Sequence, residues 1–143
     1  MCQVTLTHDF LFKTDGYSDG YTRMVDIMGK VEGVVEDYLR KECNKRGYLC
    51  YKWVSPGHIG VPDDIVIGNG LTVYVECKSA VGHLIKMQKV ITERLAEHGA
   101  DVRVVYSKED VDDVLETLDS VKRWKKREVI DYRELRNTKE KSG

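Results

Sequence analysis

The sequence lacks any long hydrophobic run, and its 143 residues include only two prolines and two phenylalanines. Because a membrane-spanning helix needs about 20 consecutive apolar residues, the sequence predicts no such helix. The first residues carry acidic and polar side chains where a signal peptide needs an unbroken apolar stretch after basic residues. We therefore expect a soluble, cytoplasmic protein with no membrane partner.

Motifs for several other chemistries are also missing. The four cysteines have neither a Cys-x-x-Cys spacing nor a partnering histidine cluster, which argues against structural zinc and, in a cytosolic chain, against disulfides. No glycine-rich segment is followed by Lys-Ser or Lys-Thr, so the sequence predicts no phosphate-binding loop and no nucleotide cofactor. A nucleophilic serine motif is absent as well.

Charge is almost balanced overall, with 23 basic and 24 acidic residues, but it is unevenly distributed. Residues 100–119 contain seven acidic and two basic residues, whereas residues 121–143 form a basic C-terminal segment. Basic side chains around an aromatic residue can neutralise phosphates and stack on a base, although a solvated helix end has the same composition. The segment therefore supplies candidate nucleic-acid contacts at Lys122, Arg123, Lys125, Lys126 and Arg127, beside Trp124.

Length and an apolar content of 41% indicate one globular domain spanning residues 1–143. The clearest helix covers residues 23–46, where apolar side chains recur at three- and four-residue steps before Gly47. We centre this apolar stripe near Val31. Residues 1–25 form an N-terminal extension of unassigned role, without sustained periodicity apart from a short strand near residues 4–12.

The remaining elements alternate between strands and helices. Gly68-Asn69-Gly70 between two apolar runs predicts a hairpin, because these residues tolerate the positive φ values of a tight turn. Helix–strand alternation predicts an α/β fold, with a mixed sheet flanked by helices. The expected strands are 48–54, 65–67, 71–75 and 102–106, and the expected helices are 84–98 and a segment that follows Ser107 and reaches Val121.

Charged residues gather at the open end of the predicted hairpin. Asp63 precedes the first strand, while Glu76 and Lys78 end the second and share one face, because side chains alternate along a strand. Two neighbouring carboxylates repel each other, and magnesium or manganese is a fitting neutralising partner. A metal-bound phosphate would then be open to attack by water, with Lys78 positioning that water or stabilising negative charge. Cys77 could add its backbone carbonyl as a ligand.

An alternative interpretation is that Asp63 and Asp64 are ordinary turn residues and that Glu76 and Lys78 lie on a solvated strand face. The two strands carry Ile65-Val66-Ile67 and Val73-Tyr74-Val75, runs that are typical of central rather than edge strands. Charges at the end of a buried strand favour the functional interpretation.

The order of these motifs resembles the VRR-NUC family, a branch of the PD-(D/E)XK nuclease superfamily, and especially its small stand-alone forms in phages and bacteria. The resemblance covers residues 30–113. It rests on Gly60-Val61-Pro62-Asp63, on Glu76-Cys77-Lys78 and on Gln88 in the following helix. If the protein is encoded by a phage, the cytoplasm is that of the bacterial host.

The resemblance implies a restriction-endonuclease-like αβββαβ core and a Mg²⁺- or Mn²⁺-dependent endonuclease that hydrolyses phosphodiester bonds in DNA. It implies Asp63 and Glu76 as metal ligands and Lys78 as the catalytic lysine, with Gln88 orienting Lys78 or the water. It also implies a glutamate from the first helix. Glu32 and Glu36 both qualify, and we prefer Glu32 because it lies nearer the expected apolar stripe.

Further expectations concern the substrate. His58, in the loop before Asp63, is a candidate phosphate contact, although a lone loop histidine is more often without a role. Small stand-alone relatives tend to be homodimers acting on branched DNA such as four-way junctions. The competing hypotheses are a non-catalytic DNA- or partner-binding module on the same fold and a nuclease directed at RNA. Asp64 and the loop 79–82 depart from the family pattern, which leaves substrate preference open.

Overall fold

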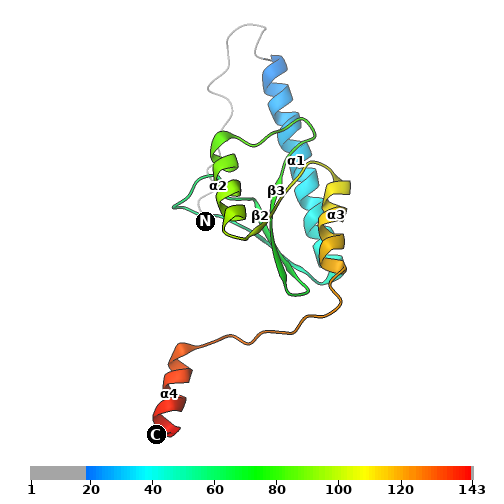
Figure 1. Cartoon of the computed structure of the whole chain (residues 1–143). Helices are drawn as coiled ribbons and strands as arrows, with labels where there is room; N and C mark the ends of the chain where they lie inside the picture. The colour runs from blue at the N-terminus through cyan, green and yellow to red at the C-terminus, as the bar shows by residue number, and fades with distance from the viewer. Residues whose placement is uncertain (1–18, 143) are drawn as a thin grey trace.

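A computed structural model describes the backbone of residues 19–142 and the side chains of residues 30–142. The predicted order of helix, three strands, helix, strand and helix is confirmed, and one more helix follows (Figure 1). The short strand expected near residues 4–12 lies outside the described residues. The elements are α1 (Asp19–Arg46), β1 (Leu49–Lys52), β2 (Asp64–Gly68), β3 (Leu71–Cys77), α2 (Lys86–Glu97), β4 (Asp101–Val105), α3 (Lys108–Asp119) and α4 (Tyr132–Ser142).

The four strands form one mixed sheet in the order β1-β2-β3-β4. β1, β2 and β3 are antiparallel, and β3 and β4 are parallel because α2 carries the chain across between them. The hairpin strands β2 and β3 are therefore the two central strands, as their apolar runs predict. The turn residues Asn69 and Gly70 have φ values of 49° and 81°, the left-handed conformation that the hairpin requires.

Helices cover both faces of the sheet (Figure 1). α1 and α3 pack together on one face, and α2 lies on the other. The buried core lies between the sheet and the α1–α3 pair, where alternate residues of β3 are buried. Its members include Leu39, Val66, Val73, Val75, Leu115 and Leu118.

The α1 stripe is not centred on Val31. Val31 and Val34 are 39% and 52% exposed, and the buried positions are Val35, Leu39 and Cys43. Val34 is exposed while the adjacent Val35 is buried, so the buried face of α1 points in a different direction from the one expected. α1 also extends beyond the end of the sheet (Figure 1). Periodicity alone gives the apolar face of a helix but not where its packing partner ends.

The C-terminal boundaries also differ from those predicted. α3 begins after Ser107, whose hydroxyl accepts a hydrogen bond from the Asp110 backbone nitrogen at 3.1 Å, but it ends at Asp119 rather than reaching Val121. The chain then runs extended to α4, which lies away from the sheet (Figure 1). None of the described helices is both long enough and apolar enough to span a membrane.

Candidate active site

Asp63 and Glu76 occupy facing positions at one end of the central hairpin. The β2–β3 register pairs Asp64 with Val75, so Asp63 falls opposite Glu76 one position further along. Two hydrogen bonds fix Asp63: its Oδ2 accepts one from the Cys77 backbone nitrogen at 2.9 Å, and its carbonyl accepts one from the Trp53 nitrogen at 2.8 Å. The predicted meeting of the two carboxylates is therefore a consequence of the strand pairing.

Glu76 is a buried carboxylate with one satisfied and one unsatisfied oxygen. Its side chain is 1% exposed, so the solvated strand face of the alternative interpretation is wrong for this residue. Its Oε1 lies 3.0 Å from Lys78 Nζ and also accepts a hydrogen bond from Gln88 Nε2. Its Oε2 is buried and has no hydrogen-bond partner. Burial raises the pKa of Glu76 even though Lys78 acts in the opposite direction.

Gln88 reaches Glu76 from the first turn of α2. Its Oε1 accepts a hydrogen bond from the Ile85 backbone nitrogen at 3.2 Å, which fixes the amide so that Nε2 faces Glu76. Gly60, in the loop before Asp63, allows that loop to lie close to the start of α2. It has a φ of 95°, and a Cβ there would lie 2.9 Å from the Met87 carbonyl carbon. The loop before Asp63 therefore packs directly on the backbone of α2.

The two α1 glutamates reach different parts of the site. Glu32 Oε1 lies 3.4 Å from the Ser79 backbone nitrogen, in the loop after Lys78. Glu36 Oε1 accepts a hydrogen bond from Lys52 Nζ at 2.7 Å, and the same Nζ lies 3.5 Å from Asp63 Oδ1. Both candidates therefore border the site, Glu32 beside the Lys78 loop and Glu36 through Lys52.

Lys52 is a member of this cluster that sequence reasoning did not select. Burial acts to lower its pKa, but the hydrogen bond to Glu36 and the charge of Asp63 outweigh burial, so the pKa is raised. The lysine is therefore held in its charged form between two carboxylates. Its position opposite Asp64 depends on the β1–β2 register, which the sequence does not state.

The carboxylates at this end of the hairpin can supply only some of the ligands of a hard divalent cation, so water and substrate would have to supply the others. Within residues 30–142, no three His, Cys, Asp or Glu side chains are grouped closely enough to hold a metal. Magnesium, however, is commonly bound by one or two carboxylates, with waters and substrate phosphates filling the other positions. Asp63 and the unpaired Oε2 of Glu76 meet that requirement. Cys77 has its thiol buried on the opposite face, so only its backbone could contribute.

Comparisons with known proteins agree with this geometry, although no sequence profile of a protein family matches the chain. A solved structure described as a VRR_NUC domain aligns with 59% of this chain and 94% of its own length, with a TM-score of 0.55 and 32% sequence identity. The chain belongs to the VRR_NUC family. It is also 47% identical over 49 residues, or 34% of its length, to "Putative nuclease p44" of Acyrthosiphon pisum secondary endosymbiont phage 1. That match spans about half, 53%, of the phage protein.

Family membership confirms the resemblance based on the ordered motifs and the restriction-endonuclease-like core that it implies.

Asp64 is the position where this VRR_NUC chain departs from the expected pattern. Its side chain points to the face of the sheet opposite to that of Glu76. It is fully buried, and neither carboxylate oxygen has a hydrogen-bond partner, although Arg40 Nη2 lies 3.9 Å from Oδ1. Burial, followed by the charge of Glu36, raises the pKa of Asp64 to about 7.

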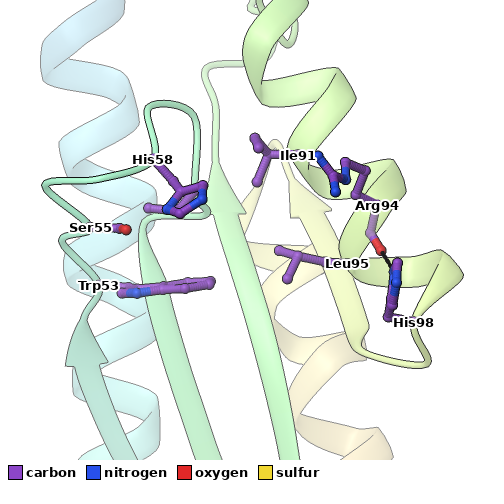
Figure 2. A pocket seen from close by; sticks show the side chains of 8 residues that line it. Trp53, Ser55, His58, Ile91, Arg94, Leu95 and His98 are labelled. Atoms are coloured by element: carbon purple, nitrogen blue, oxygen red, sulfur yellow. Dashed lines mark hydrogen bonds between the residues drawn. The ribbon is translucent and has the colours of Figure 1, made fainter.

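His58 lines a surface pocket between the β1–β2 loop and α2 (Figure 2). The pocket has a volume of about 350 Å³, and we call it the Trp53 pocket. In Figure 2, Trp53 and His58 form one side, and Ile91 and Leu95 of α2 form the other. Its lining residues are Trp53, Ser55, His58, Val61, Ile91, Arg94, Leu95 and His98.

The basic C-terminal segment lies away from Asp63, Glu76 and Lys78. Trp124 packs near the hairpin turn, where a Cβ on Gly70 would be 3.2 Å from the Trp124 Cβ. That turn is about 20 Å from Glu76 along β3, at the usual strand rise. Lys125 and Arg127 line a second pocket with the hairpin turn and Arg46. The five predicted basic contacts are thus not brought together with Asp63, Glu76 and Lys78.

Proposed function

We propose that this protein is a Mg²⁺- or Mn²⁺-dependent endonuclease that hydrolyses phosphodiester bonds in DNA. The observation that carries the proposal is Glu76, whose buried Oε2 has no partner while Lys78 and Gln88 hold Oε1. A buried carboxylate oxygen without a partner is costly, and a cation that arrives with the substrate would satisfy it. Membership in the VRR_NUC family and the name of the phage relative support the same activity.

In this proposal, Asp63 and Glu76 bind the metal, with a backbone carbonyl of Cys77 and a water-mediated contact from Glu32 or Glu36. When bound, the metal supplies Lewis-acid chemistry to the phosphate. Cys77 and Trp53 hold Asp63 through backbone hydrogen bonds, so its carboxylate needs little reorganisation.

Lys78 is the proposed catalytic lysine. Its side chain is 12% exposed, and its ammonium group lies at the edge of the buried carboxylate rather than in open solvent. From that position it can donate a hydrogen bond to the attacking water or to a phosphate oxygen as negative charge develops. Gln88 is a positioning residue, because it holds the Glu76 oxygen that Lys78 also contacts.

A cleavage assay tests the proposal. Wild-type protein, Lys78→Ala and Lys45→Ala are incubated with labelled linear, flapped and four-way-junction DNA in magnesium or in EDTA. We expect cleavage only in magnesium, a loss of about 100- to 1,000-fold in Lys78→Ala and no loss in Lys45→Ala. Lys45 is the matched control because it is exposed and pairs with Glu42 at the far end of α1. Equal products from wild type and Lys78→Ala, or products in EDTA, would contradict the proposal.

The same assay separates the alternatives. DNA binding without cleavage of any substrate would support a non-catalytic module on this fold. Faster cleavage of matched RNA would support an RNA-directed nuclease.

Branched DNA as the substrate and a homodimer as the active species remain parts of the proposal that rest on the resemblance alone. A dimer would place two sites opposite two strands of a junction. Light scattering with and without a four-way junction measures the oligomeric state directly. A monomer in both conditions would contradict the proposed dimer.

The basic C-terminal segment is proposed to contact DNA at a distance from the cleaved bond, because its residues Trp124, Lys125 and Arg127 lie at the other end of β3. Plotted as the logarithm of affinity against the logarithm of salt concentration, binding should fall with a slope that steepens by nearly one for each phosphate that the segment neutralises. Truncation after residue 120 should therefore weaken binding and flatten that dependence, while the metal requirement stays unchanged. Unaltered salt dependence would contradict this role.

A further inference from the structure

We propose that the Trp53 pocket binds one unpaired nucleobase of the DNA substrate, next to the phosphodiester bond that is cleaved. This inference rests on the proposed nuclease function and adds a substrate class to it. It rests on the lining of the pocket, on its charge and on its connection to the catalytic cluster, by which we mean Asp63, Glu76, Lys78 and Gln88.

The lining of the pocket is suited to a flat, largely apolar ring. Trp53 forms one side of the pocket (Figure 2). It packs against Tyr74 with ring centroids 5.1 Å apart, so the indole is held in place. Ile91 and Leu95 supply aliphatic surface on the opposite side. The volume of about 350 Å³ lies within the range of small-ligand pockets. Stacking on an aromatic side chain suits any base, because every base has a π-face.

The charge of the pocket is suited to a nucleotide. His58, Arg94 and His98 line it, and no acidic residue is among its lining residues. The Arg94 guanidinium makes no ion pair or hydrogen bond within the part of the chain whose side chains are described. The nearby His98 Nδ1 lies 2.7 Å from the Arg94 backbone carbonyl, not from its guanidinium. A guanidinium at the edge of an apolar pocket is well placed to bind the phosphate beside a stacked base.

Two direct connections join the pocket to the catalytic cluster. The Trp53 backbone nitrogen donates a hydrogen bond to the Asp63 carbonyl at 2.8 Å. On α2, Gln88 contacts Glu76 while Ile91 and Leu95, three and seven residues later, lie on the same helix face. At the helical rise, these two residues are about 4.5 and 10.5 Å from Gln88 along the axis. The pocket is therefore about one or two nucleotides from the proposed metal site.

A base within a duplex is paired and stacked, so it can enter this pocket only after leaving the helix. Extrusion is least costly where a base is already mismatched or unpaired. The pocket therefore favours DNA that has an unpaired nucleotide beside the cleaved bond, as in a flap, a bulge or the single-stranded arm of a branch. Fully paired linear DNA should be a poorer substrate.

Tryptophan fluorescence tests the inference, because the chain has only two tryptophans and Trp124→Phe leaves Trp53 as the sole reporter. The double variant Trp124→Phe, Lys78→Ala is titrated in magnesium with a duplex carrying one unpaired thymine. The control is the same duplex with an abasic site in place of the thymine. We expect the thymine to quench Trp53, and the abasic duplex to bind about 5- to 150-fold more weakly without quenching. Equal affinity and unchanged fluorescence would overturn the inference.

Point variants separate this inference from the proposed function. Arg94→Ala should raise KM for the flapped substrate, whereas Lys89→Ala removes a positive charge from α2 outside the pocket and should leave KM unchanged. Trp53→Phe should retain most of the binding that Trp53→Ala loses. Cleavage that is insensitive to all these changes would refute the pocket but leave the nuclease intact. Base-dependent quenching in a protein that cleaves no DNA would refute the nuclease but leave the pocket intact.

Discussion

Gln88 Nε2 donates its hydrogen bond to the same Glu76 oxygen that lies 3.0 Å from Lys78 Nζ. One oxygen of a buried carboxylate thus has two partners, and the other has none. This asymmetry links α2 to the end of β3 and leaves a single acceptor free to bind a cation.

Asp63 and Asp64 are adjacent residues with opposite expected roles. Asp63→Asn should reduce cleavage by 100-fold or more, because it removes a proposed metal ligand, and should leave stability nearly unchanged. Asp64→Asn should retain cleavage and raise the free energy of unfolding at pH 8 by about 1–3 kcal/mol, because it removes a buried negative charge that has no hydrogen bond. Urea unfolding and the cleavage assay measure both effects. Loss of cleavage in Asp64→Asn but not in Asp63→Asn would show that Asp64, rather than Asp63, is the metal ligand.

Gln88 should act on the reaction through Glu76 rather than on folding. Gln88→Ala should lower kcat about tenfold and move the acidic limb of the pH–rate profile, because the amide no longer stabilises the ionised form of Glu76. Losing this hydrogen bond should raise the pKa of Glu76 further, so the limb should move to higher pH. Lys89→Ala, on the next position of α2, provides the control. A pH profile that matches wild type would rule out the positioning role.

Gly60 should be required for the loop that leads to Asp63. Gly60→Ala places a Cβ 2.9 Å from the Met87 backbone at a φ of 95°, so we expect a loss of about 1–3 kcal/mol in stability together with reduced cleavage. Gly57→Ala in the same loop meets no atom within 4 Å and should be nearly neutral. Thermal unfolding of both variants distinguishes a backbone requirement from general loop sensitivity.

Tyr48 should make stability fall at alkaline pH. Burial, with the hydrogen bond to Asp119, raises the pKa of Tyr48 to about 12. Between pH 10 and 12 the unfolded chain loses this proton before the folded chain does, so the free energy of unfolding should decrease as pH rises. Tyr48→Phe should cost about 1 kcal/mol at pH 8 and lose this alkaline decrease. Tyr51→Phe, at an exposed tyrosine, should retain it.

Local sequence signals account for most of the fold and for the centre of the site. The Gly68-Asn69-Gly70 turn sets the β2–β3 register, and that register alone places Asp63 opposite Glu76. Strand alternation then puts Glu76 and Lys78 on one face. These relationships depend on residues close together in sequence, so they could be predicted.

Relationships between distant elements could not be predicted in the same way. Lys52 joins Glu36 to Asp63 only because of how β1 pairs with β2 and how α1 crosses the sheet. The exposure of Val31 depends on where the sheet ends beneath α1. The first residues of the basic C-terminal segment, around Trp124, lie at the hairpin turn because α3 ends there, which their composition does not reveal.

The most direct test is anomalous diffraction from crystals of the protein soaked in manganese. We predict one strong peak within about 2.0–2.3 Å of an Asp63 carboxylate oxygen and of Glu76 Oε2, and no peak in crystals of Glu76→Gln. Manganese bound at Asp64 on the other face, or no peak between Asp63 and Glu76 at saturating manganese, would contradict the account.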